Sequence, residues 1–203
     1  VWSPYLFENY KKENFRAEAS SLFSIFVILL LGVTVVFSLY SIEIVQILSN
    51  YKYAKASIYF PILCIPMSIY LLFPFVSSGI LVSRQTNYIG ISYVLGSVLN
   101  FTSIIVLIRS IGIIAVPISL ALSRVLTFIV LRCKSNTVLK IECPSVLLVL
   151  LSIIAVISSI LNCYCVDLII RVVISIIIIV CICRFLSKNY GIGNLLRIIN
   201  KTK

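Results

Sequence analysis

The sequence contains no histidine, and only 6 of its 203 residues are Asp or Glu. Histidine is the commonest general base in enzymes and a common metal ligand. Its absence removes the commonest basis for an acid–base active site and a common basis for a metal site. Charged residues of either sign make up only 11% of the chain, whereas hydrophobic residues make up 61%. This composition lies far outside that of a water-soluble domain and predicts a protein embedded in a membrane.

Long hydrophobic stretches fill most of the chain. They cover residues 22–40, 58–81, 88–108, 111–131, 146–161 and 166–183. A hydrocarbon core of about 30 Å requires about 20 apolar residues in helical form, and backbone groups left unpaired in lipid cost several kcal/mol each. The sequence therefore predicts an all-α fold, a polytopic membrane helix bundle of about six transmembrane helices spanning residues 22–184.

Two flanking segments differ from this bundle. Residues 1–21 alternate aromatic and charged side chains, which predicts an amphipathic segment at the lipid headgroups; a flexible polar lead is the alternative. Residues 185–203 form a basic tail that we expect to bind an anionic lipid surface.

The net charge of +11 is not a nucleic-acid signal, because the basic residues are sorted by loop. Twelve of the 17 Lys and Arg fall on one predicted side, and four fall on the other side, at Lys52, Lys55, Arg109 and Arg171. The positive-inside rule then places both termini in the cytoplasm, and an even number of helices agrees with that placement.

The 7 cysteines predict neither a metal site nor a disulfide framework. Four of them form Cys-x-Cys pairs, Cys163 with Cys165 and Cys181 with Cys183. Residues two apart point to different faces of a helix, so we expect the cysteines to act as small packing residues. No cofactor is indicated.

Arg124 is the one ionisable residue placed well inside a predicted transmembrane helix. It lies eight residues before Arg132, which puts it about 12 Å deeper along the helix. A guanidinium at that depth is costly unless it extends to the headgroups, pairs, or faces a water-filled cavity. The sequence leaves two alternatives, extension to the headgroups and a position facing a cavity. In a cavity, the forked donors of the guanidinium suit a phosphate or pyrophosphate.

Helix 88–108 carries a second polar residue, Asn100, four residues after Gly96 and eight after Ser92. Small residues at this spacing favour close helix packing, with Asn100 as an interhelical hydrogen bond; a position along a substrate path is the alternative. Helix 58–81 contains Pro61, Pro66 and Pro74, and we expect it to kink.

With these residues in view, the stretch from Tyr59 to Phe128 resembles the C-terminal half of Wzx-type polysaccharide and O-antigen flippases, in the multidrug/oligosaccharidyl-lipid/polysaccharide superfamily. The similar features are a helix that ends in SGIL, the polar turn SRQTN, a helix with Asn100 near its middle, and the turn LIRSIGI from Leu107 to Ile113. The opening SPYLFENYKK is similar to the amphipathic link that precedes this half.

The resemblance implies a transporter that moves undecaprenyl-pyrophosphate-linked oligosaccharide, an O-antigen or capsule repeat unit, across the bacterial inner membrane. Arg124 and Asn100 would then contact the substrate, while Arg84 and Arg132 would assist its capture. Family members have two lobes that move against each other, and six helices form only one lobe. We therefore expect an N-terminal lobe or partner chain that completes the transporter.

Other classes of protein fit less well. A membrane enzyme such as an oligosaccharide polymerase needs a large external loop with clustered catalytic groups, and no loop here is long enough, so we do not expect an enzyme. A multidrug or cation antiporter of the same superfamily usually needs a carboxylate inside the membrane, whereas Glu43 and Asp167 lie at helix edges. A structural membrane subunit without transport activity is the third alternative.

The charge pattern makes a topological prediction. A reporter fused after Lys203 should fluoresce as a cytoplasmic protein and be inactive as a periplasmic phosphatase, because both termini are expected inside. Cysteines introduced at Lys52 or Lys55 should react with a membrane-impermeant reagent in intact cells. Labelling that requires cell lysis would contradict the predicted orientation.

Overall fold

The computed structural model describes residues 2–49 and 56–141, with six further isolated residues (Ile153, Arg171, Ile176, Ile177, Val180 and Arg184). Its elements are helices α1 (Trp2–Asn9), α2 (Phe15–Leu39), α3 (Ser41–Leu48), α4 (Phe60–Leu71), α5 (Phe73–Val76), α6 (Ser78–Val82), α7 (Asn87–Ile111), the short 3-10 helix η2 (Gly112–Ile114) and α8 (Ala115–Ser135). No strand occurs among these residues, so the predicted all-α class is confirmed for this part of the chain.

Three helical stretches are long and apolar enough to cross a membrane, namely Phe15–Leu39, Ala56–Val82 and Asn87–Ser135. The third has 49 residues and folds back on itself as α7 and α8, because Gly112 adopts a positive φ of 62° that ends α7. Of the first four predicted ranges, three fall within these stretches, and the first, 22–40, ends one residue beyond Leu39. The number of six is not confirmed, since ranges 146–161 and 166–183 and the basic tail lie almost entirely outside the described residues.

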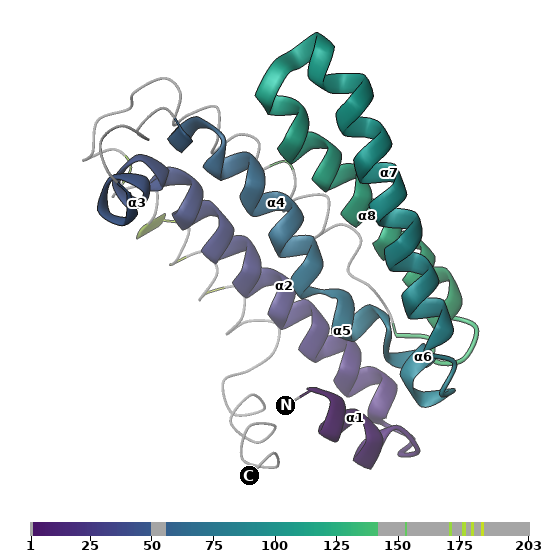
Figure 1. Ribbon diagram of the computed structural model, residues 1–203. Helices are drawn as coiled ribbons and strands as arrows, with labels where there is room; N and C mark the ends of the chain where they lie inside the picture. Colours follow the sequence, from purple (N-terminus) through teal and green to yellow (C-terminus); the bar gives the residue numbers. More distant parts are fainter. Residues whose placement is uncertain are drawn as a thin grey trace.

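The long helices lie side by side in the order α2, α4, α8, α7 (Figure 1). Hydroxyl groups join the first pair, with Thr34 Oγ1 2.6 Å from Ser68 Oγ in the interface between α2 and α4. Such bonds hold helices together where lipid tails provide no hydrophobic driving force between them. The elements α1 and α6 and the C-terminal end of α8 gather at one end of this layer, and α3 and η2 lie at the other.

Helix α2 begins at Phe15, seven residues before the predicted start at Leu22. Phe15, Ala19 and Phe23 are spaced by four, so they share one face of the helix, and all three are buried against protein. The helix extends ahead of the apolar run, on its N-terminal side, because this face packs against protein. The predicted amphipathic segment 1–21 is thus divided into α1, a turn and the first turns of α2.

The predicted kink in the second stretch takes the form of two breaks, at Leu72 and at Ser77, which separate α4, α5 and α6. Side chains from elsewhere bond to the backbone there. The indole Nε1 of Trp2 donates to the carbonyl oxygen of Pro74 and to Ser78 Oγ, both at 3.1 Å, and the amide of Gly79 donates to Ser135 Oγ at 2.8 Å. The breaks are therefore supported by α1 on one side and by α8 on the other.

Helices α7 and α8 form a close antiparallel pair through a seam of small residues. Ser92 and Gly96 of α7 are buried, as are Ser123 and Thr127 of α8. Thr127 Oγ1 donates to the Ser123 carbonyl at 2.9 Å and reaches the Ser92 carbonyl at 3.4 Å. The close approach expected from the spacing of Ser92 and Gly96 is present in the structure.

Gly96 should tolerate no side chain. A methyl group there would overlap Thr127 Oγ1 and lie 3.1 Å from Ser123 Oγ, whereas a methyl group at Gly90 of the same helix would meet nothing within 4 Å. We expect Gly96→Ala to destabilise the protein by about 1–3 kcal/mol through overpacking, and Gly90→Ala to be neutral or stabilising. Thermal unfolding in detergent micelles measures both; equal effects would contradict the seam.

Candidate functional site

The side chain of Arg124 projects from α8 against α4. Its guanidinium carbon lies 4.8 Å from the centre of the Tyr70 ring, a distance at which the ring face attracts the cation. The Tyr70 ring makes an edge contact with Phe73, with 5.4 Å between the ring centres. Phe73 makes a second edge contact with Tyr93 of α7, at 5.8 Å. Arg124 therefore belongs to an aromatic cluster that joins α4, α7 and α8.

Arg124 forms no hydrogen bond and no ion pair with the described part of the chain. Its Nε is buried without a hydrogen-bond partner, and no carboxylate in the described residues forms an ion pair with it. The Tyr70 ring faces the guanidinium but accepts no conventional hydrogen bond from it. The residue as a whole is half-buried, and its guanidinium has donors to offer to an anionic ligand.

Asn100 lies on α7, farther along the face that carries Ser92 and Gly96. Its Oδ1 is buried and has no hydrogen-bond partner among the described residues. The expected interhelical hydrogen bond is therefore not formed by this oxygen. Asn100 and Arg124 each hold one buried polar atom without a partner, and no hydrogen bond joins the two side chains in the described structure.

Arg84 lies in the turn between α6 and α7, with an exposed side chain. The amide of Gln85 bonds to the Ile80 carbonyl at 3.2 Å and the amide of Arg84 to the Leu81 carbonyl at 3.1 Å, which is the Schellman pattern of helix ends. Arg84 occupies the left-handed position of this motif, with φ of 57°, where glycine is the usual residue. A non-glycine residue there costs on the order of 1 kcal/mol.

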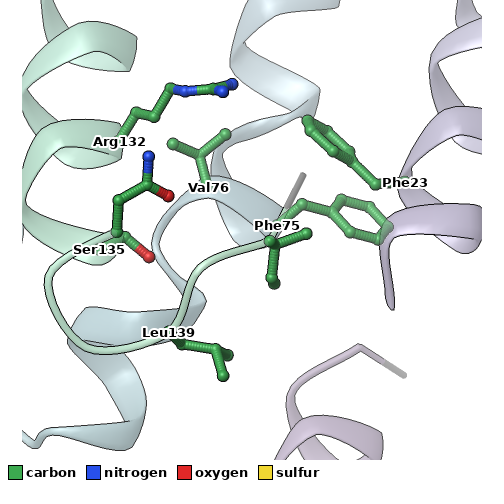
Figure 2. Close-up of a pocket in the computed structure, with 8 residues that line it drawn as sticks. Phe23, Phe75, Val76, Arg132, Ser135 and Leu139 are labelled. Atoms are coloured by element: carbon green, nitrogen blue, oxygen red, sulfur yellow. The ribbon is translucent and has the colours of Figure 1, made fainter. Parts of the chain in front are cut away.

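Arg132 borders a small hollow between α2, α5 and the end of α8 (Figure 2). The hollow is lined by Phe23, Phe75, Val76, Arg132, Ser135, Asn136, Leu139 and Ile141. Its volume is about 10 Å³, which is space for one water molecule and too little for a sugar. The structure thus places Arg84 and Arg132 at the α1 end of the layer, apart from the cluster around Arg124.

An ion pair between a buried arginine and a half-buried glutamate lies beyond the end of α2. Arg171 Nη1 donates to Glu43 Oε1 at 3.2 Å and to the Leu39 carbonyl at 3.4 Å. Arg171 is only 7% exposed, and the second carboxylate oxygen of Glu43 is buried without a hydrogen-bond partner among the described residues. The pair fastens a residue of the predicted sixth helix to α3.

Sequence reasoning missed both Tyr70 and the partnership of Glu43 with Arg171. Aromatic residues are common in membrane helices, so Tyr70 carries no signal until a cation is placed over its ring. Glu43 and Arg171 lie 128 residues apart, and single-sequence spacing contains no information on such pairs. Opposite charges at the edges of two predicted helices on one side of the membrane were the available hint.

No described group of three or more His, Cys, Asp or Glu residues is arranged to hold a metal ion. Cys64 and Cys133, the two cysteines within the described ranges, are free thiols. Comparison with known proteins found no matching family model, no matching curated protein and no matching solved structure.

The Glu43–Arg171 pair should be energetically coupled. Arg171→Met leaves the Glu43 carboxylate without its counter-charge, and Glu43→Gln leaves the buried Arg171 guanidinium without its counter-charge, so each should destabilise the protein by about 1–3 kcal/mol. The double variant should lose less than the sum of the two single losses. Thermal unfolding of all four proteins in micelles measures the coupling, and strictly additive losses would show that the pair contributes nothing.

Proposed function

We propose that this chain is part of a flippase that translocates undecaprenyl-pyrophosphate-linked oligosaccharide across the bacterial inner membrane. The observation that carries the proposal is the guanidinium of Arg124, which lies within a membrane-length stretch, stacks on Tyr70 and has no anionic partner among the described residues. A pyrophosphate group supplies the negative charge and the acceptor oxygens that such an arginine lacks.

The surroundings of Arg124 support binding of an anion. Away from bulk water, a charge pair is screened much less than at a surface, so a single well-placed arginine has a large effect on a pyrophosphate. The Tyr70 ring holds the guanidinium without neutralising it, and 43% of Tyr70 is exposed. The buried Oδ1 of Asn100 on the neighbouring helix α7 is an acceptor, so it suits a sugar hydroxyl of the substrate and not the pyrophosphate.

The proposed transport cycle needs a second lobe. A lobe that rocks against a partner alternately opens its central face to the two sides of the membrane. Helices α4, α7 and α8, which carry the Arg124 cluster, belong to the single layer that the structure describes. We propose that a partner lobe covers this layer, and that Arg84 and Arg132 at the α1 end attract the substrate before Arg124 binds it.

The antiporter alternative places the chemistry on a carboxylate instead. Glu43 is the acidic residue nearest the end of α2, and one of its oxygens is held by Arg171. An engaged carboxylate of this kind favours a structural role over ion coupling, and the flippase proposal is the stronger of the two.

Substitution of Arg124 tests the proposal in a complete transporter that contains this chain and its partner lobe. Arg124→Ala should lower surface-glycan export at least tenfold at an unchanged protein level, because the pyrophosphate loses its paired donors. Arg124→Lys should rescue export only in part, since it keeps the charge but loses the fork. Tyr70→Phe should export normally, because the phenyl face still holds the cation.

Arg109→Ala is the matched control, because Arg109 is an exposed arginine in the last turn of α7, at the end of the layer opposite α1. It should export like the parent protein. Normal export by Arg124→Ala at parental protein level would refute the proposal and leave extension toward the headgroups as the role of this side chain.

A further inference from the structure

The short helix α1 is fastened to the rest of the protein by one face. Leu6 is completely buried, and the Trp2 ring packs 4.2 Å from the Phe75 ring centre while its indole bonds to the broken helix. Tyr5 donates its hydroxyl to Glu18 Oε2 at 2.9 Å. Burial and this hydrogen bond raise the pKa of Tyr5 to about 12, so the phenol keeps its proton in any physiological buffer.

The turn after α1 and the first turn of α2 carry exposed basic side chains. Lys11, Lys12 and Arg16 all point to solvent, and none of them pairs with a carboxylate in the described part of the chain. Lys12 bonds to the neutral Asn9 side chain at 2.6 Å, and Lys11 lies 5.7 Å from the centre of the Tyr10 ring. Glu8 and Glu13 are exposed in the same segment, so its net charge is +1, and the exposed Arg84, Lys134 and Lys140 add positive charge at the same end of the layer.

We propose that residues 2–16 form a strap whose basic residues bind anionic phospholipid headgroups, and that this binding holds the breaks around α5 in their bent form. The occupant follows from charge complementarity and position, because the segment joins directly to the end of a membrane-length helix. Each basic residue close to an anionic membrane surface favours binding about fivefold. The Trp2 side chain couples α1 to the breaks, because Trp2 belongs to α1 and its indole donates to the Pro74 carbonyl.

This inference is independent of the proposed transport activity, and the chain contains its own reporter. Trp2 is the single tryptophan in the sequence, so intrinsic fluorescence reports on the strap alone. Hydrogen exchange at the amides of residues 77–80 reports on the break, because the Gly79 amide bonds to Ser135 Oγ and the adjacent Ser78 accepts the Trp2 indole through its hydroxyl.

The experiment compares the protein in nanodiscs of phosphatidylcholine with the protein in nanodiscs that contain one quarter phosphatidylglycerol. In the anionic discs, acrylamide should quench Trp2 about threefold less, and the amides of residues 77–80 should exchange several-fold more slowly. Adding 0.5 M salt should abolish both differences, because the cations are exposed and therefore screened. Replacing Lys11, Lys12 and Arg16 by Gln should have the same effect, whereas Arg109→Gln at the opposite end should leave both differences intact.

Three results would overturn the inference. Equal quenching in the two kinds of disc would show that lipid charge does not act on the strap. A change in quenching without a change in exchange would show that α1 covers the break without controlling it. If inorganic phosphate lowers Trp2 quenching and slows amide exchange in neutral discs, the basic residues bind a soluble anion and not the lipid headgroups. If the triple variant fails to insert, the salt titration of the unmodified protein decides the question.

Discussion

The arrangement of this protein depends on hydrogen bonds made to a broken helix from outside it. The stretch from Ala56 to Val82 is broken at Leu72 and Ser77, on either side of Pro74. In a membrane each backbone group freed by a break must find a partner within the protein. Ser78 of the same stretch and Trp2 of α1 both donate to the Pro74 carbonyl, and Ser135 supplies an acceptor to the Gly79 amide. The positions of α1 and of the end of α8 are tied to the bonds of Trp2 and Ser135.

The break at Ser77 also affects how α8 packs on its neighbours. Gly79 lies so close to Ser135 that a methyl group there would overlap the Ser135 carbonyl, which brings the last turn of α8 against α6. Nearer the middle of the layer, α8 packs on α7 through Gly96 and on α4 through Tyr70 and Arg124. One helix therefore contacts both of its neighbours, and the guanidinium of Arg124 lies in the interface between α8 and α4.

Charge is distributed over the described structure by position along the layer. Lys11, Lys12, Arg16, Arg84, Arg132, Lys134 and Lys140 belong to segments at the α1 end, whereas Arg109 ends α7 at the opposite end. Lys134 lies over the Tyr88 ring at 4.6 Å, so aromatic and basic residues occur together there, as they do at membrane surfaces. The grouping expected from loop charges is thus seen in space for these residues.

Several features could be predicted from the sequence because they rest on local rules. Apolar runs of about 20 residues predict membrane helices, prolines predict breaks, and the spacing of Ser92 and Gly96 predicts close packing, since each depends on neighbours along one helix. The start of α2 at Phe15 was missed, because it depends on burial of Phe15 in the core cluster that also contains Leu6 of α1, and the length of an apolar run does not report such packing.

The candidate site shows the same division. Sequence alone determined that Arg124 lies deep within an apolar helix and that Asn100 shares a face with small residues, because depth and face follow from helical geometry. Only the tertiary structure decided that Tyr70 holds the guanidinium, that Asn100 Oδ1 has no hydrogen-bond partner in the described chain, and that Glu43 pairs with Arg171. Those outcomes depend on which helices become neighbours, and that choice is made by packing and hydrogen bonding between segments far apart in the chain.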